Sequence, residues 1–266
     1  MLVLLPPSEG KAAAPVRGAR LDLARLSFTG LTATRSTLVD AVTTLCAGDP
    51  EVARQTLGLS PGLVDAIDAD RRLLTSVTMP VARLYTGVLY DSLGLASLEA
   101  PALRRARRSL LVFSALWGAV RLGDRLPPYR LAPDVTLPGL GSIASLWKIP
   151  LAQALDEAAG RGLVLDLRSG SYVPLWRPTG AVADRTVTLR VLQERRPGDP
   201  SSRVVVSHFN KATKGRLVRA LLESGADPRR PAGLVEAIRD LGFTAETGSR
   251  AGPGRTHQVD VIVAEL

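Results

Sequence analysis

Short apolar segments, separated by stretches with helical periodicity, limit most strongly how this chain can fold. Apolar runs typical of buried strands or half-exposed strands lie at 1–5, 110–114, 163–167, 186–192, 204–207 and 259–263. Helical spacing or helix end signals lie at 35–47, 60–74, 103–108, 145–159, 210–224 and 231–241. Strands that alternate with helices in this way predict an α/β (α+β) fold, with a mixed β-sheet surrounded by helices.

The chain shows no internal boundary between domains. We expect a single domain over residues 1–266, in which a helical hairpin-like segment at about 35–74 is inserted after the first strand. Residues 117–133 hold two glycines and three prolines, which predicts a long ordered loop, and 196–200 predicts a turn. Hydrophobic residues make up 45% of the chain, enough to bury one core of this size.

The N-terminal residues and the single cysteine bear on the cellular compartment. The first six residues lack a basic leader, and no apolar run approaches the roughly 20 residues needed to span a bilayer. We therefore expect a cytoplasmic protein that does not enter a membrane. Cys46 follows Val42 and Leu45 at helical spacing, which predicts a buried thiol. One cysteine excludes a disulfide within the chain and a peroxide-reducing thiol pair.

Basic residues are concentrated in the last two thirds of the chain. The net charge is +9, and residues 101–266 carry 25 basic and 15 acidic side chains. A basic surface favours a polyanionic partner such as nucleic acid. Only four of the 34 basic residues are lysine, and the excess of arginine is also typical of a GC-rich genome. A lysine retained in such a chain indicates a position where a compact ammonium is needed, at Lys11, Lys148, Lys211 or Lys214.

Four of the expected strands run into loops that contain a serine soon after the strand. These serines are Ser8, Ser114, Ser169 and Ser207. In open α/β sheets, ligands bind beyond the carboxyl ends of the strands, so hydroxyls and backbone amides gathered there suit an anion. Serine is also common in ordinary loops, and that alternative stays open.

The expected helix at 210–224 carries two of the lysines near its start. On a helical wheel, Lys211 and Lys214 lie on the same side as Leu217 and Leu221, which form the apolar stripe. Lysines on that side would face a cleft at the sheet edge, although their stems can also lie over the core. Lys211 is the first choice among single site residues, because an ammonium at a helix start indicates a shared anionic ligand.

Six sequence motifs, in order, resemble the YaaA family of bacterial proteins, which is linked to peroxide-stress resistance and DNA binding. The motifs lie at 6–11, 84–87, 113–121 with 128–131, 146–147, 166–172, and 207–211 with 214–216. The chain departs from the family pattern at several positions. Lys148 replaces a common glycine, and Ala212 stands where a second lysine is usual. The resemblance is therefore to a divergent member.

The resemblance implies a compact α/β fold, a positively charged cleft, a helix-hairpin-helix-like element and affinity for DNA, with protection against iron-driven damage. The candidate hairpin is 57–59, although an ordinary turn between helices explains it better. No cofactor is implied. His208 and His257 have no cysteine or carboxylate at ligand spacing, so we expect no metal site.

Two functional hypotheses follow. The first is a non-enzymatic stress protein that binds DNA independently of sequence and in a salt-sensitive way, through Arg104, Arg105, Arg107, Arg108, Arg121 and Arg216. The second is an enzyme, or a binder of a nucleotide, nucleobase or other anion, whose pocket is formed by Ser8, Lys11, Tyr129, Arg130, Ser169, Tyr172, Lys211 and Lys214. Tyr172 would form hydrogen bonds or transfer a proton there. The sequence indicates neither a catalytic set nor an oligomeric state.

Overall fold

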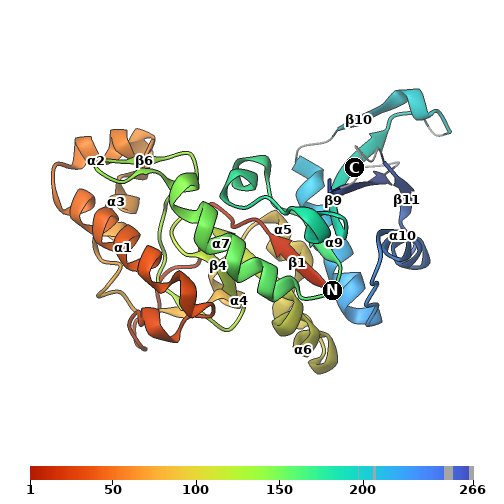
Figure 1. Ribbon diagram of the computed structural model, residues 1–266. Helices are drawn as coiled ribbons and strands as arrows, with labels where there is room; N and C mark the ends of the chain where they lie inside the picture. Colours follow the sequence, from red (N-terminus) through yellow and green to blue (C-terminus); the bar gives the residue numbers. More distant parts are fainter. Residues whose placement is uncertain (197, 206–207, 249–253, 264–266) are drawn as a thin grey trace.

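The computed structural model describes residues 1–196, 198–205, 208–248 and 254–263 (Figure 1). The strands are β1 Leu2–Leu5, β2 Met79–Pro80, β3 Leu110–Ser114, β4 Gly118–Arg121, β5 Arg125–Leu126, β6 Thr136–Leu137, β7 Gly141–Ser142, β8 Val164–Asp166, β9 Thr186–Glu194, β10 Arg203–Val205, β11 Thr244–Thr247 and β12 His257–Val263. The helices are α1 Thr32–Ala47, α2 Pro50–Thr56, α3 Val64–Arg71, α4 Val81–Leu84, α5 Val88–Leu93, α6 Ala100–Ser109, α7 Ile143–Ala159, α8 Gly180–Ala183, α9 His208–Ser224 and α10 Pro231–Asp240.

A mixed sheet forms the centre of the molecule, as the sequence predicts. Its order is β11-β12-β9-β8-β1-β3-β4, and β10 pairs with β9 beyond the end of β8. Strands β3, β1, β8, β9 and β12 run parallel, whereas β4, β10 and β11 are antiparallel to their neighbours. The carboxyl ends of β1, β3 and β8 therefore meet at one edge.

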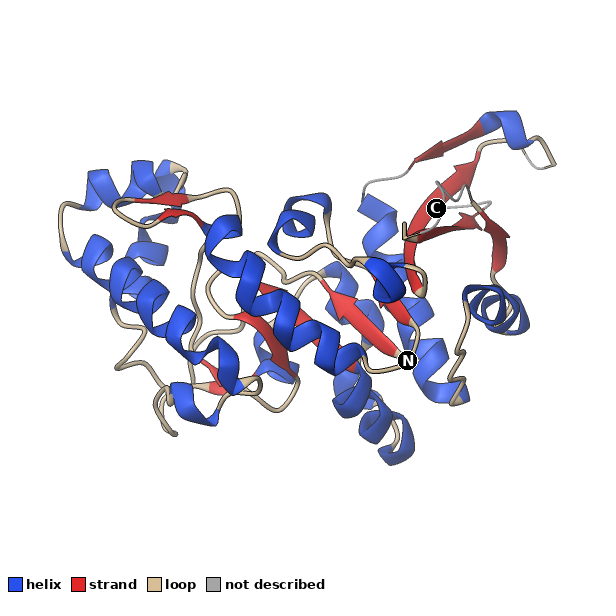
Figure 2. Ribbon diagram, viewed as in Figure 1, coloured by secondary structure: helices blue, strands red, loops and turns tan. Residues whose placement is uncertain are grey.

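Every residue of β1, β3 and β8 is buried, which explains why these strands are almost continuously apolar. Helix α7 crosses one face of the sheet, and α5, α6 and α9 cover the other (Figure 1). Helices α1, α2 and α3 form a group at the far end from the C-terminal strands (Figure 2). Their apolar side chains join the same hydrophobic core as the sheet.

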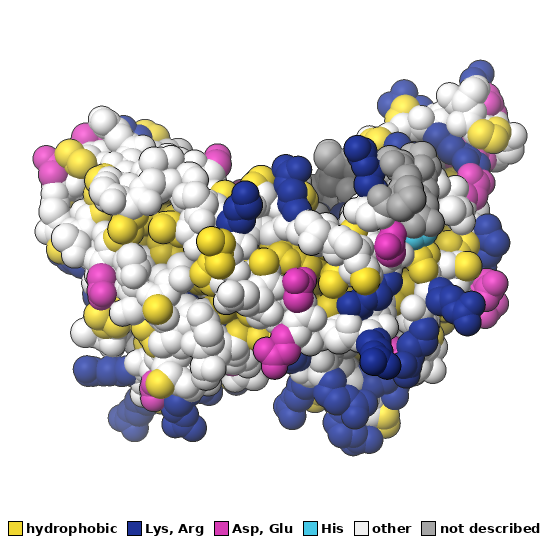
Figure 3. All heavy atoms as spheres, viewed as in Figure 1, with side chains coloured by type: hydrophobic (Ala, Val, Ile, Leu, Met, Phe, Trp, Pro, Cys, Tyr) yellow, Lys and Arg dark blue, Asp and Glu magenta, His cyan; other side chains and the backbone are white. Residues whose placement is uncertain are grey.

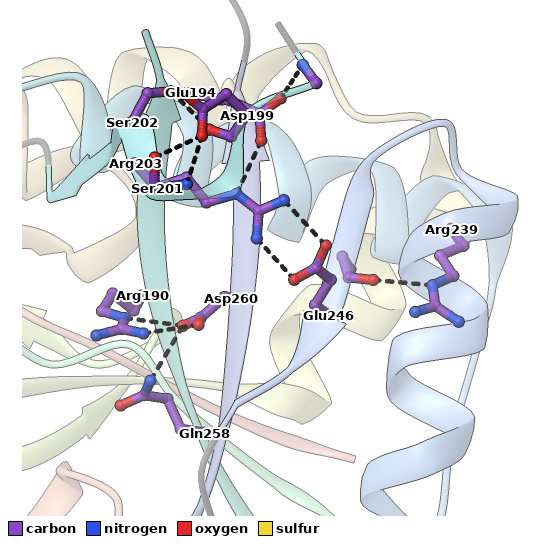
Figure 4. A network of polar contacts seen from close by, with 12 residues as sticks. Arg190, Glu194, Asp199, Ser201, Ser202, Arg203, Arg239, Glu246, Gln258 and Asp260 are labelled. Atoms are coloured by element: carbon purple, nitrogen blue, oxygen red, sulfur yellow. Dashed lines mark hydrogen bonds and ion pairs between the residues drawn. The ribbon is translucent and has the colours of Figure 1, made fainter. Parts of the chain in front are cut away.

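Arginine–carboxylate pairs tie the C-terminal strands together (Figure 4). Arg203 on β10 lies 2.8 Å from Glu194 on β9 and 2.8 Å from Glu246 on β11. Arg190 on β9 makes two hydrogen bonds, of 2.8 and 2.7 Å, to Asp260 on β12. Part of the arginine content of this chain therefore holds the sheet together.

One sequence prediction about local structure is wrong, and one expected helix is shorter than predicted. Residues 117–133 are not a continuous loop, because they contain β4 and β5. Strand β4 is short and buried, so it lacks the alternating pattern that would reveal it. The helix expected at 60–74 starts as a 3-10 turn, Pro61–Leu63, and α3 ends at Arg71. Leu73 continues the apolar pattern, but it reaches the core from a turn.

The other expected strands and helices are present, with ends that differ by a few residues. Residue 197 of the expected turn and residues 206–207 of the expected strand lie outside the described residues. The candidate hairpin at 57–59 directly follows α2. Leu57 and Leu59 are buried, and Gly58 between them has a φ of 63°. This arrangement matches an ordinary helix C-cap, in which glycine takes the left-handed conformation.

Candidate functional site

A cavity of about 640 Å³ lies at the carboxyl ends of β1 and β8. Four separate parts of the chain line it. They are the loop after β1 at 6–11, the start of α5 at 86–90, the loop at 129–134, and the turn at 169–172. Helix α9 adds Lys211. The cavity is therefore at the sheet edge where the strand-end rule for α/β folds locates ligands.

Lys11 lies in the cavity wall in an unusually apolar setting. Its Nζ donates to the Ser8 carbonyl at 3.0 Å and lies 4.4 Å from the centre of the Tyr129 ring. A β-bridge between Lys11 and Tyr85 fixes the backbone of this loop. Burial, followed by repulsion from Arg130, lowers the pKa of the Lys11 ammonium to about 8. A substantial fraction of this amine is therefore neutral at slightly alkaline pH.

Asp70, on α3, is a buried carboxyl next to the cavity wall. Its Oδ1 accepts a hydrogen bond of 2.9 Å from the backbone N–H of Arg130. Its Oδ2 is buried and has no hydrogen-bond partner among the described residues. Burial raises the pKa of Asp70 to about 7, although the Arg130 N–H and the charges of Lys11 and Arg130 act in the opposite direction.

A chain of hydroxyl groups lies behind the cavity wall. The Tyr129 hydroxyl lies 2.6 Å from Ser114 Oγ and 2.8 Å from the Tyr85 hydroxyl. Ser114 Oγ also accepts hydrogen bonds from the backbone N–H groups of Leu116 and Trp117. Ser114 is therefore a supporting residue rather than a lining residue, and burial raises the pKa of Tyr129 well above its ordinary value.

Arg168 supports the part of the wall that carries Ser169 and Tyr172. It is fully buried and makes two hydrogen bonds to Asp166, of 2.9 and 2.7 Å. It also donates to the carbonyl oxygens of Tyr172 and Trp176, at 3.1 and 3.0 Å. One guanidinium thus fixes the turn of residues 170–175 to the end of β8.

The structure brings together most of the pocket residues that the sequence predicts. Those that line the cavity are Ser8, Lys11, Tyr129, Arg130, Ser169, Tyr172 and Lys211. Lys214 does not line it. One helical turn beyond Lys211, it is half-buried, and burial lowers its pKa while Asp166 acts to raise it. Ser207 lies outside the described residues.

Sequence reasoning missed several groups near this cavity. Glu9 pairs with Arg130 at 3.3 Å, and Asp134 also lines the cavity. Asp70 lies on α3, more than fifty residues along the chain from both Lys11 and Arg130. The available signal for Asp70 was its position three residues after the buried Ile67, which puts a carboxyl on the inward face of α3.

The arginines proposed for DNA contact have different environments. Arg104, Arg107 and Arg108 on α6 are exposed, and so is Arg216 on α9. Figure 3 shows basic side chains gathered over the region of α6. Arg105 instead donates to the Leu222 and Glu223 carbonyls at the end of α9, at 2.6 and 3.1 Å. Arg121 donates to the Arg108 carbonyl at 3.0 Å and lies over the Phe28 ring.

Cys46 is buried on α1, as its spacing predicts. Burial, with a contribution from the nearby Asp70, raises the pKa of the Cys46 thiol to about 12. The thiolate is the form that reacts with peroxides, so this thiol is held in its unreactive form at neutral pH.

A sequence model of the family described as "Peroxide stress protein YaaA" matches residues 1–247. The chain belongs to the YaaA family. A UPF0246 protein of Streptomyces coelicolor is 56% identical over the full length of both chains. A UPF0246 protein of Corynebacterium efficiens is 39% identical over 99% of this chain and all of its own. An uncharacterized protein of Campylobacter jejuni is 30% identical over 53% of this chain and 52% of its own.

These comparisons confirm the family that the six sequence motifs indicate. No helix in the described part of this YaaA-family chain has the length and apolar character needed to cross a membrane. Across the same residues, no group of three or more His, Cys, Asp and Glu side chains is arranged to hold a metal ion.

Replacing Asp70 by asparagine is expected to change how stability depends on pH. Burial raises the folded-state pKa of Asp70. The contribution of protonated Asp70 to the free energy of unfolding is therefore fully present below about pH 4 and is lost as pH rises through about 7. Asp70→Asn removes the cost of ionisation but leaves a buried amide with unmet donors. We expect a net gain of about 1–3 kcal/mol in the free energy of unfolding at pH 8, and less at pH 4.5.

Urea unfolding at the two pH values measures this difference. The control is Asp68→Asn on the same helix, because the Asp68 side chain is exposed and, among the described residues, pairs with Arg71 at the surface. An Asp70→Asn effect that is equal at pH 4.5 and pH 8 would contradict the raised pKa.

Proposed function

We propose that this protein binds a small ligand carrying one or two negative charges in the cavity at the carboxyl ends of β1 and β8. The proposal rests on the convergence of basic and hydroxyl side chains from distant parts of the chain on one cavity. Residues as distant in sequence as Lys11, Arg130, Ser169 and Lys211 line one cavity. Its volume, about 640 Å³, is in the range usual for small-molecule sites.

The charges of the lining favour a small anion over a polyanion. The lining contains three basic side chains, Lys11, Arg130 and Lys211, and two acidic ones, Glu9 and Asp134. The cations can hold a phosphate or carboxylate, while the acids would repel a long phosphate backbone. Tyr172 and the apolar side chains of Val88 and Leu131 would contact the uncharged part of a nucleotide-sized ligand.

Lys211→Ala tests this proposal, because Lys211 is exposed at the first turn of α9 and lines the cavity. We expect at least a roughly tenfold loss of affinity for AMP or pyrophosphate, measured by calorimetry. The free energy of unfolding should stay unchanged or rise by about 0.3–1 kcal/mol, because a cation at a helix start is unfavourable.

Lys148→Ala is the matched control, since Lys148 is exposed on α7 and is not among the lining residues. Adenosine is the uncharged control ligand. If Lys211→Ala lowers the melting temperature and leaves anion binding intact, Lys211 has a structural role and does not bind the anion.

A second proposal concerns duplex DNA, and the exposed arginines of α6 favour it. Helix α6 carries Arg104, Arg107 and Arg108 on its surface and contains no acidic residue. Side chains of this kind can follow a phosphate backbone without reading its sequence. Bound at this face, the protein would protect DNA during peroxide stress, which agrees with the description of its family.

Replacing Arg104, Arg107 and Arg108 together by glutamine is expected to weaken duplex binding at low salt by at least tenfold. The slope of log K against log salt should fall by roughly 3, because three phosphate contacts are lost. Fluorescence anisotropy over a salt series measures both. The control is Arg105→Gln, which removes the hydrogen bonds to the end of α9 and should mainly lower thermal stability. An unchanged slope in the triple variant would rule out α6 as the DNA-binding face.

A further inference from the structure

Lys11 differs from the other cations of the cavity in how it is held. Arg130 pairs with Glu9, and Lys211 is exposed to solvent. Lys11 is half-buried, and among the described residues its Nζ donates a hydrogen bond to the Ser8 carbonyl. No carboxylate of the described residues lies within ion-pair distance of its Nζ. Lys11 therefore lines the cavity without a carboxylate in direct contact with its ammonium.

The surroundings of Lys11 also suit a reactive amine. Tyr129 and Tyr85 present their rings to Nζ at 4.4 and 5.6 Å, so water is excluded on that side. Arg130 is the cationic neighbour that most disfavours the ammonium. Desolvation and an adjacent cation are the two means by which proteins convert a lysine into a nucleophile.

We propose that Lys11 is the reacting group of this cavity, and that it condenses reversibly with the aldehyde or ketone carbonyl of a small anionic ligand. The inference rests on the proposed ligand site and adds the chemical class of the ligand. Arg130 and Lys211 would hold the anionic end of the ligand, and Lys11 Nζ would reach its carbonyl carbon.

The condensation of Lys11 with a carbonyl group requires neither an oxidant nor a cofactor. The lone pair of Lys11 Nζ forms a bond to the carbonyl carbon as the π bond of the C=O group breaks, and one amine proton moves to the oxygen to give a neutral carbinolamine. Loss of that hydroxyl as water, with loss of the second amine proton, leaves a C=N bond in place of the C=O bond. The products are one imine and one water molecule, and hydrolysis reverses the step.

The charged groups near Lys11 act on its ammonium in opposite directions. Arg130 disfavours the ammonium, while Asp70 and Glu9 favour it. Asp70 is itself protonated over part of the neutral range, because burial raises its pKa to about 7. The yield of imine should rise between pH 6 and pH 9 as Lys11 loses its proton, since only the neutral amine attacks a carbonyl.

Reductive trapping with pyridoxal 5′-phosphate, an anionic aldehyde, tests the proposal on the full-length protein. The protein is incubated with the aldehyde at pH 8, reduced with borohydride, digested and analysed by mass spectrometry. The chain has four lysines, which serve as internal controls. We expect occupancy at Lys11 at least tenfold higher than at Lys148, Lys211 or Lys214. Labelling that is equal among them, or absent at Lys11, overturns the proposal.

Two variants separate this proposal from the ligand site on which it rests. Lys11→Arg keeps a cation but cannot form an imine, so it should still bind pyrophosphate and should lose the trapped adduct. Lys211→Met should keep the Lys11 adduct but need more aldehyde to reach it. If pyrophosphate binds the native protein and no Lys11 adduct forms, only the imine proposal fails. If pyrophosphate does not bind either, both proposals fail.

Discussion

Replacing Arg168 by methionine is expected to cost about 3–5 kcal/mol of the free energy of unfolding, the range typical of breaking a buried ion pair. The Arg168 side chain is fully buried, and its partner Asp166 is nearly so. Removing the guanidinium leaves a buried carboxylate without its cation and two carbonyl oxygens, of Tyr172 and Trp176, without their donor. Methionine fills much of the space over Phe113 and Trp176 but replaces none of these hydrogen bonds.

Denaturant unfolding, with Arg190→Met as the control, tests this expectation. Arg190 also makes two hydrogen bonds to an aspartate, Asp260, but its side chain is 45% exposed. Asp260 is only 11% exposed but keeps a hydrogen bond from Gln258, so the control should cost about 1–2 kcal/mol, less than the loss expected for Arg168→Met. Similar losses in the two variants would contradict the view that burial makes the Arg168 pair critical.

Arg168→Met should also weaken ligand binding in molecules that remain folded. Arg168 fixes the turn that carries Ser169 and Tyr172, and both residues line the cavity. The affinity for pyrophosphate should therefore fall in Arg168→Met and stay unchanged in Arg190→Met. This makes Arg168 a positioning residue for the candidate site.

The sequence could predict the cavity only where its residues follow strands. Ser8, Lys11 and Ser169 come shortly after β1 or β8, and the carboxyl ends of parallel strands meet at one edge. Asp70 could not be located in the same way. It belongs to the helical group at the far end of the fold and reaches the cavity wall through the backbone of Arg130, a tertiary contact without a sequence pattern.

The arginines show a second limit of sequence reasoning. Arg105 and Arg108 are three residues apart on α6, and composition alone gives both the same expected role. In the structure, Arg105 turns toward the end of α9 and Arg108 stays at the surface. The sequence cannot distinguish an arginine that donates to carbonyl groups of its own protein from one that is exposed and able to bind a phosphate.

Replacing Gly215 by alanine is expected to cost about 3 kcal/mol or more, at the upper end of the effects of overpacking. Gly215 lies in the middle of α9, where this helix packs against α5. A Cβ at this position would lie 2.3 Å from the Leu89 carbonyl oxygen, 2.8 Å from Ser92 Cβ and 3.1 Å from the Leu93 backbone nitrogen. Two of these atoms belong to the backbone, so a side-chain rotation cannot relieve the contact.

Gly233→Ala provides the matched control, because Gly233 is also inside a helix, α10, and a Cβ there would come no closer than 3.9 Å to a neighbour. Alanine is the better helix former, so this control should be neutral or stabilising by up to about 1 kcal/mol. Thermal and urea unfolding of the two variants measure the contrast. A Gly215→Ala variant as stable as the native protein would show that α5 and α9 can move apart at little cost.

The position of Gly215 connects this packing to the candidate site. Lys211 lies one turn before it on α9, and Leu89 and Tyr90 on α5 line the same cavity. A methyl group that separates the two helices must therefore move Lys211 away from the opposite wall. Gly215→Ala molecules that stay folded should lose affinity for pyrophosphate, while Gly233→Ala molecules keep it. The close contact between α5 and α9 then sets the width of the cavity as well as the stability of the fold.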